Sequence, residues 1–561
     1  MASTDDISSP SRLTSRLAAL FLFLAAANCA LQILWFSRFC GRNLSTDAIS
    51  YTGIARHILD RQFSRSLNGY WSPLFSWLMV AFHALSTNFI LLGHWLTLAT
   101  LLACLPLLHL LCFRLWRSHL AAALAVFWFS LARGVLAASV CMIIADFLFA
   151  ALVLAYFNFL LSCLRRDRSR DWLLLGAAHA AAFLAKAFAM PWLAVSTLLA
   201  ITLHRRHAPA KLARAAIAAL LLPVAIYTGW GQLLKTRYGS FTAGYQLRYN
   251  LLINYRRSLV GKGAIHDEPQ LHFGGYDEYM VTDVPPEGRA FSLARKELVP
   301  VIVDAERFNL PRALKELVIL LTPGGVLAIG LALMLLWPRR SQHPAETAFV
   351  VVALSSAAIL IAAYCMLVFD GRYLLPVLPI LLAIAALGPC PSPQQRRDMS
   401  PELRALWKTS VALTLLSVVF FIAYWSSPFR KIDGDFQSSS RAAAELLRRE
   451  QPGGHSLIGI GTGPYPAEGV GGEANLYTAF FAGRQLIAIS ESLPPASALD
   501  QFVAAATSAR PDAVVIWGSP ADDAYSNLVA KLNAAPSATS ARKLTDPAQG
   551  EVGTLILFSH R

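Results

Sequence analysis

The sequence predicts a mainly α-helical, polytopic membrane protein of about 11 spans, followed by a C-terminal α/β domain outside the cytoplasm. Hydrophobic residues make up 55% of the 561 residues and charged residues only 15%, and the mean hydropathy is +0.48. Apolar runs of about 20 residues, the length that crosses a bilayer core, recur up to about residue 428. The remainder alternates short strand-like and helix-like patterns. This composition excludes a soluble enzyme, a disordered scaffold and a secreted disulfide-rich module.

The charge balance predicts membrane orientation rather than nucleic-acid binding. The chain has 49 Lys and Arg against 34 Asp and Glu, which leaves a net charge of +15. These basic residues fall mainly in short clusters between apolar runs, the pattern that orients membrane proteins, and we expect no nucleic-acid partner. The eight cysteines form no CxxC pair and no cluster with histidines, which argues against a disulfide framework or a zinc site.

We expect the membrane bundle over residues 1–428. The first apolar run ends without a convincing cleavage site, so it is interpreted as a retained span. The candidate spans are 17–36, 90–113, 120–140, 147–164, 172–185, 187–203, 212–233, 314–337, 346–368, 373–389 and 409–425. Most basic clusters agree with a cytoplasmic N-terminus in the inner (plasma) membrane, although the first long connection is itself basic. In that orientation the long connections 37–89 and 234–313 and the tail lie outside the cytoplasm.

The first long connection predicts two elements at the membrane surface. Tyr51, Ile54, Ala55, Ile58 and Leu59 recur at helical spacing, which predicts an amphipathic helix along the outer interface. The aromatic and Pro-containing stretch from Tyr70 to Leu85 predicts a second interfacial or re-entrant piece. The connection 234–313 shows no repeat and is long enough to be either functional or disordered.

The tail, 429–561, predicts a soluble α/β domain. Strand-like apolar runs alternate with helix-like patterns near 438–450, 496–509 and 521–533. The strand-like runs are Leu457–Gly461, Leu486–Ser490, Ala513–Trp517 and Thr554–Phe558. The sequence GIGTGP at 459–464 is interpreted as a strand-end turn, because Pro464 stands where a dinucleotide fingerprint needs its third glycine.

Ionisable residues near the predicted outer face are the candidate site residues, since such groups are costly beside lipid. They are Asp47, Asp146, Lys186, Asp370 and Arg372. These residues also have ordinary structural explanations. Asp47 and Asp146 could cap helices, and Lys186 could extend its ammonium group to the interface. Arg372 could anchor the interface together with Tyr373. Four separate loops nevertheless place acids and bases at the same predicted face.

Four motifs in this order carry a family resemblance. They are DAISYTGIARHILDRQFSRSLNGYWSPLFSWL (Asp47–Leu78), VCMIIADFLFA (Val140–Ala150), FLAKAFAMPWL (Phe183–Leu193) and DGRYLLPVLP (Asp370–Pro379). The chain resembles the GT-C class of membrane glycosyltransferases over roughly residues 12–390, and within it the branch of protein O-mannosyltransferases and bacterial lipid A aminoarabinose and core-sugar transferases. It departs from that branch in having Ala48 after Asp47, and Trp71-Ser72-Pro73 where relatives have a Lys-Pro-Pro element.

The resemblance implies transfer of a sugar from a polyprenyl-phosphate-linked donor to an extracytoplasmic glycan, lipid or protein. It implies catalytic roles for Asp47 and Asp146, donor-phosphate binding by Lys186 and Arg372, and substrate contacts for Tyr51, Trp71 and Tyr373. No ligand spacing demands a metal; a divalent cation shared by the acids is left open. The alternatives are a transporter or lipid flippase, and a non-catalytic relative that binds glycolipid.

Overall fold

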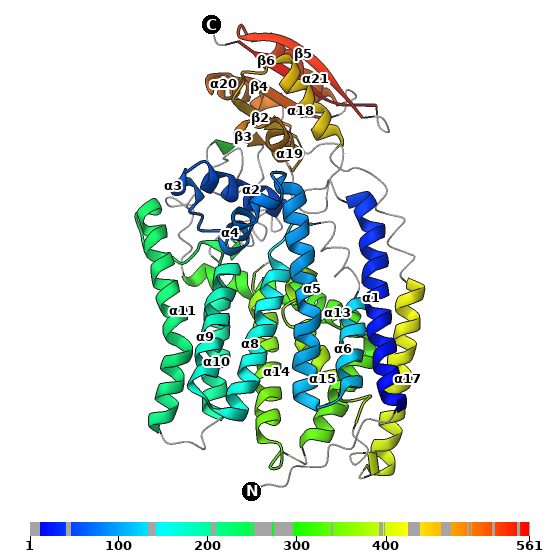
Figure 1. Cartoon of the computed structure of the whole chain (residues 1–561). Helices are drawn as coiled ribbons and strands as arrows, with labels where there is room; N and C mark the ends of the chain where they lie inside the picture. The colour runs from blue at the N-terminus through cyan, green and yellow to red at the C-terminus, as the bar shows by residue number, and fades with distance from the viewer. Residues whose placement is uncertain are drawn as a thin grey trace. The chain divides into compact units, whose positions relative to one another are not determined.

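The fold is described from a computed structural model of the chain (Figure 1). The structure describes residues 12–40, 46–132, 142–203, 209–247, 250–251, 272–273, 295–337, 340–367, 369–391, 396–397, 399–424, 438–461, 473–490, 493–494, 496–518, 522–546 and 550–559. The chain divides into two compact units. The helical unit comprises Met1–Gly41, His94–Lys235 and Arg295–Asp433, and the mixed unit comprises Arg42–Gly93, Thr236–Ala294 and Gly434–Arg561.

Long apolar helices build the helical unit, because the apolar runs can satisfy their backbone groups internally only as helices. Each predicted span contains a helix. They are α1 (Arg12–Cys40), α5 (Phe89–Trp116), α6 (His119–Leu131), α8 (Asp146–Arg166), α9 (Ser169–Ala185), α10 (Ala189–Leu203), α11 (Pro209–Tyr238), α13 (Arg295–Leu336), α14 (Pro344–Cys365), α15 (Leu378–Ala385) and α17 (Pro401–Tyr424). The second half of the predicted span 120–140 lies outside the described residues.

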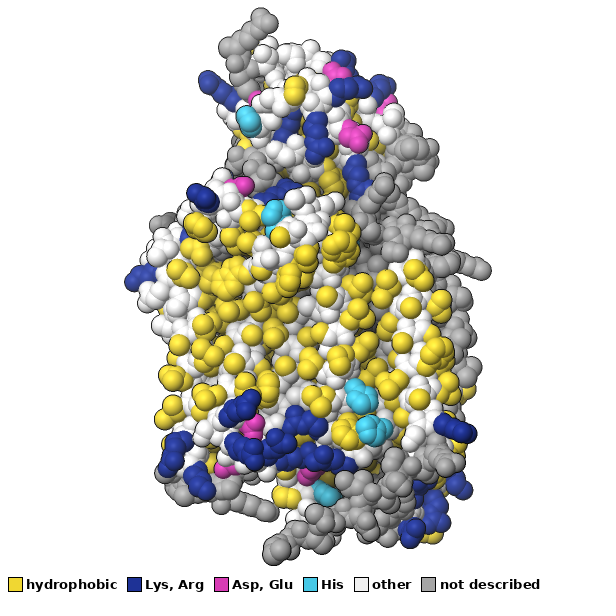
Figure 2. All heavy atoms as spheres, viewed as in Figure 1, with side chains coloured by type: hydrophobic (Ala, Val, Ile, Leu, Met, Phe, Trp, Pro, Cys, Tyr) yellow, Lys and Arg dark blue, Asp and Glu magenta, His cyan; other side chains and the backbone are white. Residues whose placement is uncertain are grey.

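Among the described residues, five helices are long and apolar enough to cross a membrane by themselves. They are Leu13–Leu34, Phe89–Trp116, Asp146–Arg166, Lys211–Tyr238 and Pro344–Cys365. The two parts of α13 would make a sixth span, Ile302–Thr322 and Gly324–Leu336, with a bend of 83° between them. Figure 2 shows a broad apolar band on this unit, with Lys and Arg side chains gathered along one of its ends. The chain is therefore a multi-pass membrane protein, while the number of 11 spans stays a prediction.

The bend in α13 has a local cause. Thr322 has φ 63° and ψ 161°, a backbone conformation that a β-branched residue rarely adopts, and it interrupts the helix. Beyond it, a side chain at Gly324 would meet the backbone of Leu413 within 2.9 Å, so only glycine allows α13 and α17 to approach this closely.

The first long connection, which belongs to the mixed unit, contains α2 (Thr46–Leu59), α3 (Phe63–Ser66), α4 (Leu74–Ala81) and η1 (His83–Leu85). The predicted helix over Tyr51–Leu59 is confirmed as α2, and the segment Tyr70–Leu85 forms α4 and η1. Tyr51, Ile54 and Ala55 are buried, but Ser50, Thr52 and His57 on other faces of the helix are buried too. The helix is therefore enclosed on most sides, unlike the expected amphipathic helix with one apolar face. Leu59 is instead 37% exposed, at the end of the helix.

A six-stranded sheet with the order β1-β3-β2-β4-β6-β5 forms the other part of the mixed unit. Its strands are β1 (His272–Phe273), β2 (Ser456–Ile460), β3 (Gln485–Ser490), β4 (Ala513–Trp517), β5 (Ala538–Asp546) and β6 (Gly550–Phe558), and its helices are α18 (Ser438–Glu450), α19 (Glu473–Ala482), η6 (Ala496–Ala498), α20 (Leu499–Ser508) and α21 (Asp523–Asn533). Strands β3, β2 and β4 are parallel, and β1, β6 and β5 pair antiparallel with their neighbours. The four predicted strands and three predicted helices are confirmed.

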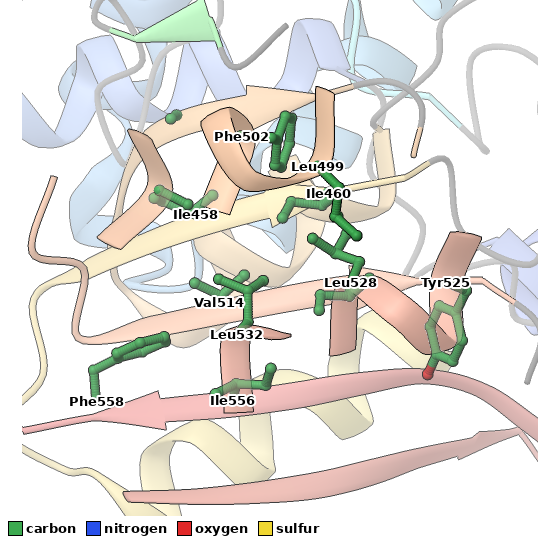
Figure 3. Packing of buried hydrophobic residues seen from close by; sticks show 13 residues of the cluster. Ile458, Ile460, Leu499, Phe502, Val514, Tyr525, Leu528, Leu532, Ile556 and Phe558 are labelled. Carbon is green, nitrogen blue, oxygen red and sulfur yellow. The ribbon is translucent and has the colours of Figure 1, made fainter. Parts of the chain in front are cut away.

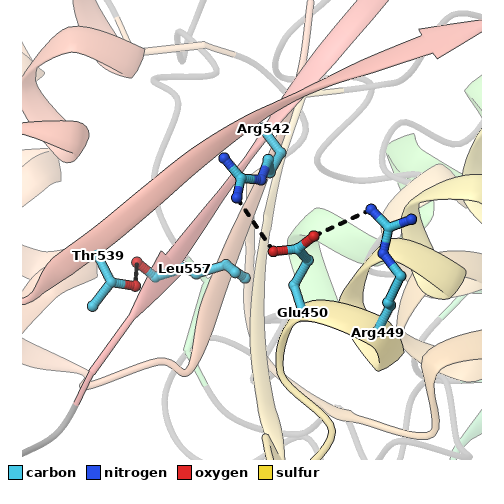
Figure 4. A network of polar contacts seen from close by, with 5 residues as sticks. All are labelled: Arg449, Glu450, Thr539, Arg542 and Leu557. Atoms are coloured by element: carbon cyan, nitrogen blue, oxygen red, sulfur yellow. Dashed lines mark hydrogen bonds and ion pairs between the residues drawn. The ribbon is translucent and has the colours of Figure 1, made fainter.

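The core of this α/β part lies between the sheet and the helices α20 and α21. Figure 3 shows how Ile458, Val514 and Ile556 of the sheet face Phe502, Leu528 and Leu532 of those helices. Ionic contacts on the surface connect α18 to β5: Glu450 pairs with Arg449 at 3.2 Å and with Arg542 at 3.4 Å (Figure 4). The alternating pattern of the sequence therefore produces a layered α/β fold with its own apolar core.

The stretch 459–464, expected to be a strand-end turn, is described only as far as Gly461; 462–464 lie outside the described residues. Strand β2 ends at Ile460, and Gly461 has φ 83°, the left-handed region that favours glycine. A side chain there would lie 2.3 Å from the Trp517 carbonyl oxygen on β4. Asn475 of α19 connects the two strand ends, because its amide donates to the Gly461 carbonyl and accepts from the Trp517 indole, each at 2.9 Å.

Candidate active site

A buried ion pair connects two predicted site residues of the helical unit. Asp146 is the first residue of α8, where a negative charge interacts favourably with the helix dipole. Lys186 follows the last residue of α9 in an extended conformation, so that its side chain leaves the helix axis. Its Nζ donates to Asp146 Oδ1 at 2.6 Å, and the two side chains are 11% and 3% exposed. The pair holds two opposite charges in a place almost without solvent.

Arg372 and Tyr373 lie next to this pair, in the short helix η4 (Gly371–Leu374). Asp370 caps η4, since its Oδ1 accepts from the backbone N–H of Arg372 at 3.1 Å. Its Oδ2 lies 3.1 Å from Arg372 Nε. The Tyr373 ring contacts both cations: Lys186 Nζ lies 5.0 Å and the Arg372 guanidinium 5.5 Å from its centroid. Such cation–π contacts hold the two positive charges near one another.

Two aromatic residues that the sequence did not single out support this arrangement. The Tyr364 ring, in the last turn of α14, stacks on Tyr373 with 4.3 Å between the centroids. Phe188 packs against Tyr364 with 5.4 Å between the centroids. Tyr364 lies outside the four motifs, and Phe188 lies within the motif Phe183–Leu193 without being singled out, because an aromatic residue in an apolar run is usually lipid-facing or core. The stack fixes the ring against which the two cations lie.

Asp47, Tyr51 and Trp71 belong to the mixed unit. Asp47 lies in the first turn of α2 and is 8% exposed. Tyr51 follows one turn later on the same helix face and is also buried. The Tyr51 ring contacts the rings of Trp71 and Phe75, with centroid distances of 5.4 and 5.2 Å. Ser76 donates to the Tyr51 carbonyl oxygen at 2.9 Å, which joins α2 to α4.

The predicted site residues therefore form two groups, one within each unit. Asp146, Lys186, Arg372 and Tyr373 come together in the helical unit, although they derive from three separate parts of the sequence. Asp47 joins Tyr51 and Trp71 in the mixed unit. The sequence offered Ser45-Thr46-Asp47 as a helix cap; Asp47 lies inside the first turn of α2, which begins at Thr46, and Ser45 lies outside the described residues.

Sequence reasoning did not identify Arg237, at the end of α11. Its Nη1 donates to the carbonyl oxygens of Ser64 at 3.0 Å, Arg65 at 2.7 Å, and also Leu67. An arginine that ends an apolar helix is usually an interface anchor, so no sequence pattern distinguishes this one. Here it holds the turn after α3.

In the described part of the chain, no group of three or more His, Cys, Asp or Glu side chains is arranged to hold a metal ion.

Solved structures share this architecture. ArnT from Cupriavidus metallidurans bound to undecaprenyl phosphate matches with a TM-score of 0.55 and 13% identity, over 96% of this chain and 97% of that chain. The apo state of the same ArnT matches with a TM-score of 0.55 and 14% identity, over the same shares. No protein-family model and no curated protein matches the sequence. ArnT is a GT-C glycosyltransferase, so the resemblance found in the motifs extends to the fold: the chain is a multi-pass membrane protein with the GT-C fold.

Proposed function

We propose that the chain is a glycosyltransferase of the inner (plasma) membrane that transfers a sugar from a polyprenyl-phosphate-linked donor to an extracytoplasmic glycan, lipid or protein. The observation that carries the proposal is the cluster of Lys186 and Arg372 around the Tyr373 ring. Fixed cations of this kind suit a lipid phosphate better than a neutral lipid. The ArnT structure with undecaprenyl phosphate supports this donor class.

The reaction needs positive charge at the leaving group. The bond between the anomeric carbon and the phosphate oxygen breaks, and the carrier phosphate retains the electron pair. Cations placed in advance stabilise that developing charge without reorganisation. The Arg372 guanidinium presents two parallel N–H groups to phosphate oxygens. Lys186 has three N–H donors, so it can bind phosphate while it still donates to Asp146.

The acceptor hydroxyl or amine loses a proton as it attacks the anomeric carbon. Asp146 already accepts a hydrogen bond from Lys186, and we assign it the role of positioning that lysine. Asp47 is then the candidate base, a buried carboxylate in the first turn of α2. With Trp71-Ser72-Pro73 in place of a Lys-Pro-Pro element, the phosphate contacts are assigned to Lys186 and Arg372 alone.

Purified full-length protein in detergent, incubated with labelled polyprenyl-phosphate sugars and a cell-envelope extract, tests the proposal. We expect free carrier phosphate to appear in step with label that enters the envelope fraction. A flippase would instead return the donor intact and move it between leaflets of vesicles. Intact donor in every incubation, with normal carrier binding, would contradict transferase activity and favour the glycolipid-binding alternative.

A further inference from the structure

Tyr70 and Trp71, between α3 and α4, form an aromatic pair in a strictly held turn. Both side chains are partly exposed. Their ring centroids lie 4.7 Å apart at an interplanar angle of 69°, and the Trp71 ring also meets Tyr51 edge-on at 66°. Edge-to-face contacts from two sides define the orientation of the indole. Trp71 therefore presents a face whose direction the protein has fixed.

The backbone below this pair is fixed by a buried asparagine. Asn68 is 2% exposed, and its Oδ1 accepts from the backbone N–H groups of Tyr70 at 2.7 Å and Trp71 at 2.8 Å. Asparagine stabilises turns in this way because its side chain replaces a backbone acceptor. The Tyr70 hydroxyl extends the network to Asn250 Oδ1 at 3.4 Å.

The second outer connection of the same unit holds the turn from the other side. Besides the three carbonyls bound by Arg237, the Tyr238 hydroxyl donates to Leu67 O at 3.3 Å and accepts from Gly69 N at 3.2 Å. Gly69 O in turn accepts from Tyr245 N at 2.6 Å. A side chain at position 69 would lie 2.4 Å from the Tyr245 ring, so this close approach requires glycine.

This degree of fixation is unnecessary for an interfacial anchor. Trp77 of α4, in the same connection, is 40% exposed, as is expected of an aromatic residue that anchors a chain at a membrane interface. Trp71 is more buried, braced by two rings and preceded by a capped turn. Rigid aromatic side chains supply contact area at low cost in conformational entropy, which is the property that binding sites use.

We propose that the Tyr70–Trp71 pair is a binding subsite for a sugar ring, with the C–H face of the ring stacked on the exposed part of the Trp71 indole. A sugar ring combines such an apolar face with a rim of hydroxyl groups, so it needs an aromatic surface with polar groups in the same site. Asp47 lies in the first turn of α2, the helix whose Tyr51 supports Trp71. The inference rests on the proposed function and names the chemistry of its substrate contact.

The test measures binding to the full-length protein in a detergent without a sugar headgroup. The probes are undecaprenyl phosphate, undecaprenyl phosphate glucose, and octyl β-glucoside below its micelle concentration with undecaprenyl phosphate already bound. We expect Trp71→Ala to weaken a glucose-containing probe about tenfold while leaving undecaprenyl phosphate unchanged. Trp71→Phe should retain most of the affinity, and Trp77→Ala serves as the matched control.

The two glucose probes distinguish the origin of the sugar. If Trp71→Ala weakens the binding of undecaprenyl phosphate glucose, the subsite binds the donor sugar. If it weakens only the binding of octyl β-glucoside, the subsite binds a sugar that is not linked to the carrier. Equal loss for undecaprenyl phosphate and its glucoside would show a hydrophobic anchor and overturn the proposal, as would unchanged binding of all probes by a folded Trp71→Ala protein. Because these measurements need no turnover, they separate failure of the subsite from failure of the transferase function.

Discussion

Lys186 Nζ lies 2.6 Å from Asp146 Oδ1, with both side chains nearly excluded from solvent, although 40 positions separate the two residues in the sequence. The contact joins the end of α9 to the beginning of α8. A buried ion pair contributes little net stability compared with apolar residues of the same shape, but the loss of one partner leaves an uncompensated charge. The pair therefore predicts an asymmetric response to mutation.

Lys186→Met should destabilise the protein by about 3–5 kcal/mol, because Asp146 would remain buried without its cation. The double variant Asp146→Leu with Lys186→Met should recover most of that lost stability. Neither the single nor the double variant should transfer sugar, because both lack the Lys186 cation. Thermal unfolding in detergent gives the stabilities, and donor turnover gives the activity. The single variant Asp146→Leu completes the comparison. If the stability changes of the two single variants simply added up to that of the double variant, the two side chains would not be coupled.

Asp47→Asn should lower turnover by about 10²–10⁴-fold and leave donor binding nearly intact, since it removes the proposed base while preserving size. If Asp47 only capped α2, this change would lower the free energy of unfolding by no more than a few tenths of a kcal/mol. Asp60→Asn, at an exposed position just after the same helix, is the matched control. Transfer at the native rate by a well-folded Asp47→Asn protein would return Asp47 to the role of helix cap.

Arg372→Lys should weaken donor binding and slow transfer, because it keeps the positive charge and loses the planar fork that binds phosphate oxygens. Arg312→Lys is the control: Arg312 also lies over an aromatic ring, 5.6 Å from the Phe308 centroid, at an exposed position of α13. Equilibrium binding of undecaprenyl phosphate and the rate of transfer are measured separately. If Arg372→Lys and Arg312→Lys changed donor binding and transfer rate equally, the proposal that Arg372 binds the phosphate would be wrong.

The tail expressed as 429–561 should fold alone as an α/β domain, since its core lies within the tail. Circular dichroism should show helix and strand with cooperative unfolding. Leu528→Ala, at a fully buried position, should cost about 2–5 kcal/mol, and Lys531→Ala on the same helix should cost less than about 0.5 kcal/mol. A disordered spectrum of the wild-type fragment would contradict the boundary.

A tag at Arg561 and a tag inserted within 252–271 should both be labelled from outside intact inner membranes, as the distribution of basic clusters predicts. A tag at Met1 should react only after the membrane is breached. The opposite pattern would reverse the orientation and place the candidate site on the cytoplasmic face.

Much of the fold could be predicted because burial imposes simple patterns. Strand β4, Ala513–Trp517, was predicted with its exact bounds, since all five residues are apolar and buried. Strand β5, Ala538–Asp546, escaped prediction because it is a polar strand that, among the described strands, lies at the sheet edge and pairs with β6 alone. Helix α19 also escaped, and β1 is too short to show an alternation.

The sequence allowed us to predict which residues belong to the site, but not which of them contact one another. Asp146 and Lys186 were recognisable because charges interrupt apolar runs there. Their contact depends on how α8 packs against α9, which no local pattern encodes. Arg237 was missed for a related reason: it binds backbone carbonyls, and carbonyls are the same in every residue.

Strand β1 has a consequence for biosynthesis. His272 pairs with Ile489 and Phe273 with Ala488, so one edge of the sheet comes from a connection translated well before the rest. The long helices α13, α14 and α17 must be made between the two partners. Because domains fold as the chain emerges, β1 has no β3 to pair with until synthesis is nearly complete. A nascent chain halted before residue 485 would therefore expose this segment to proteases that the finished protein resists.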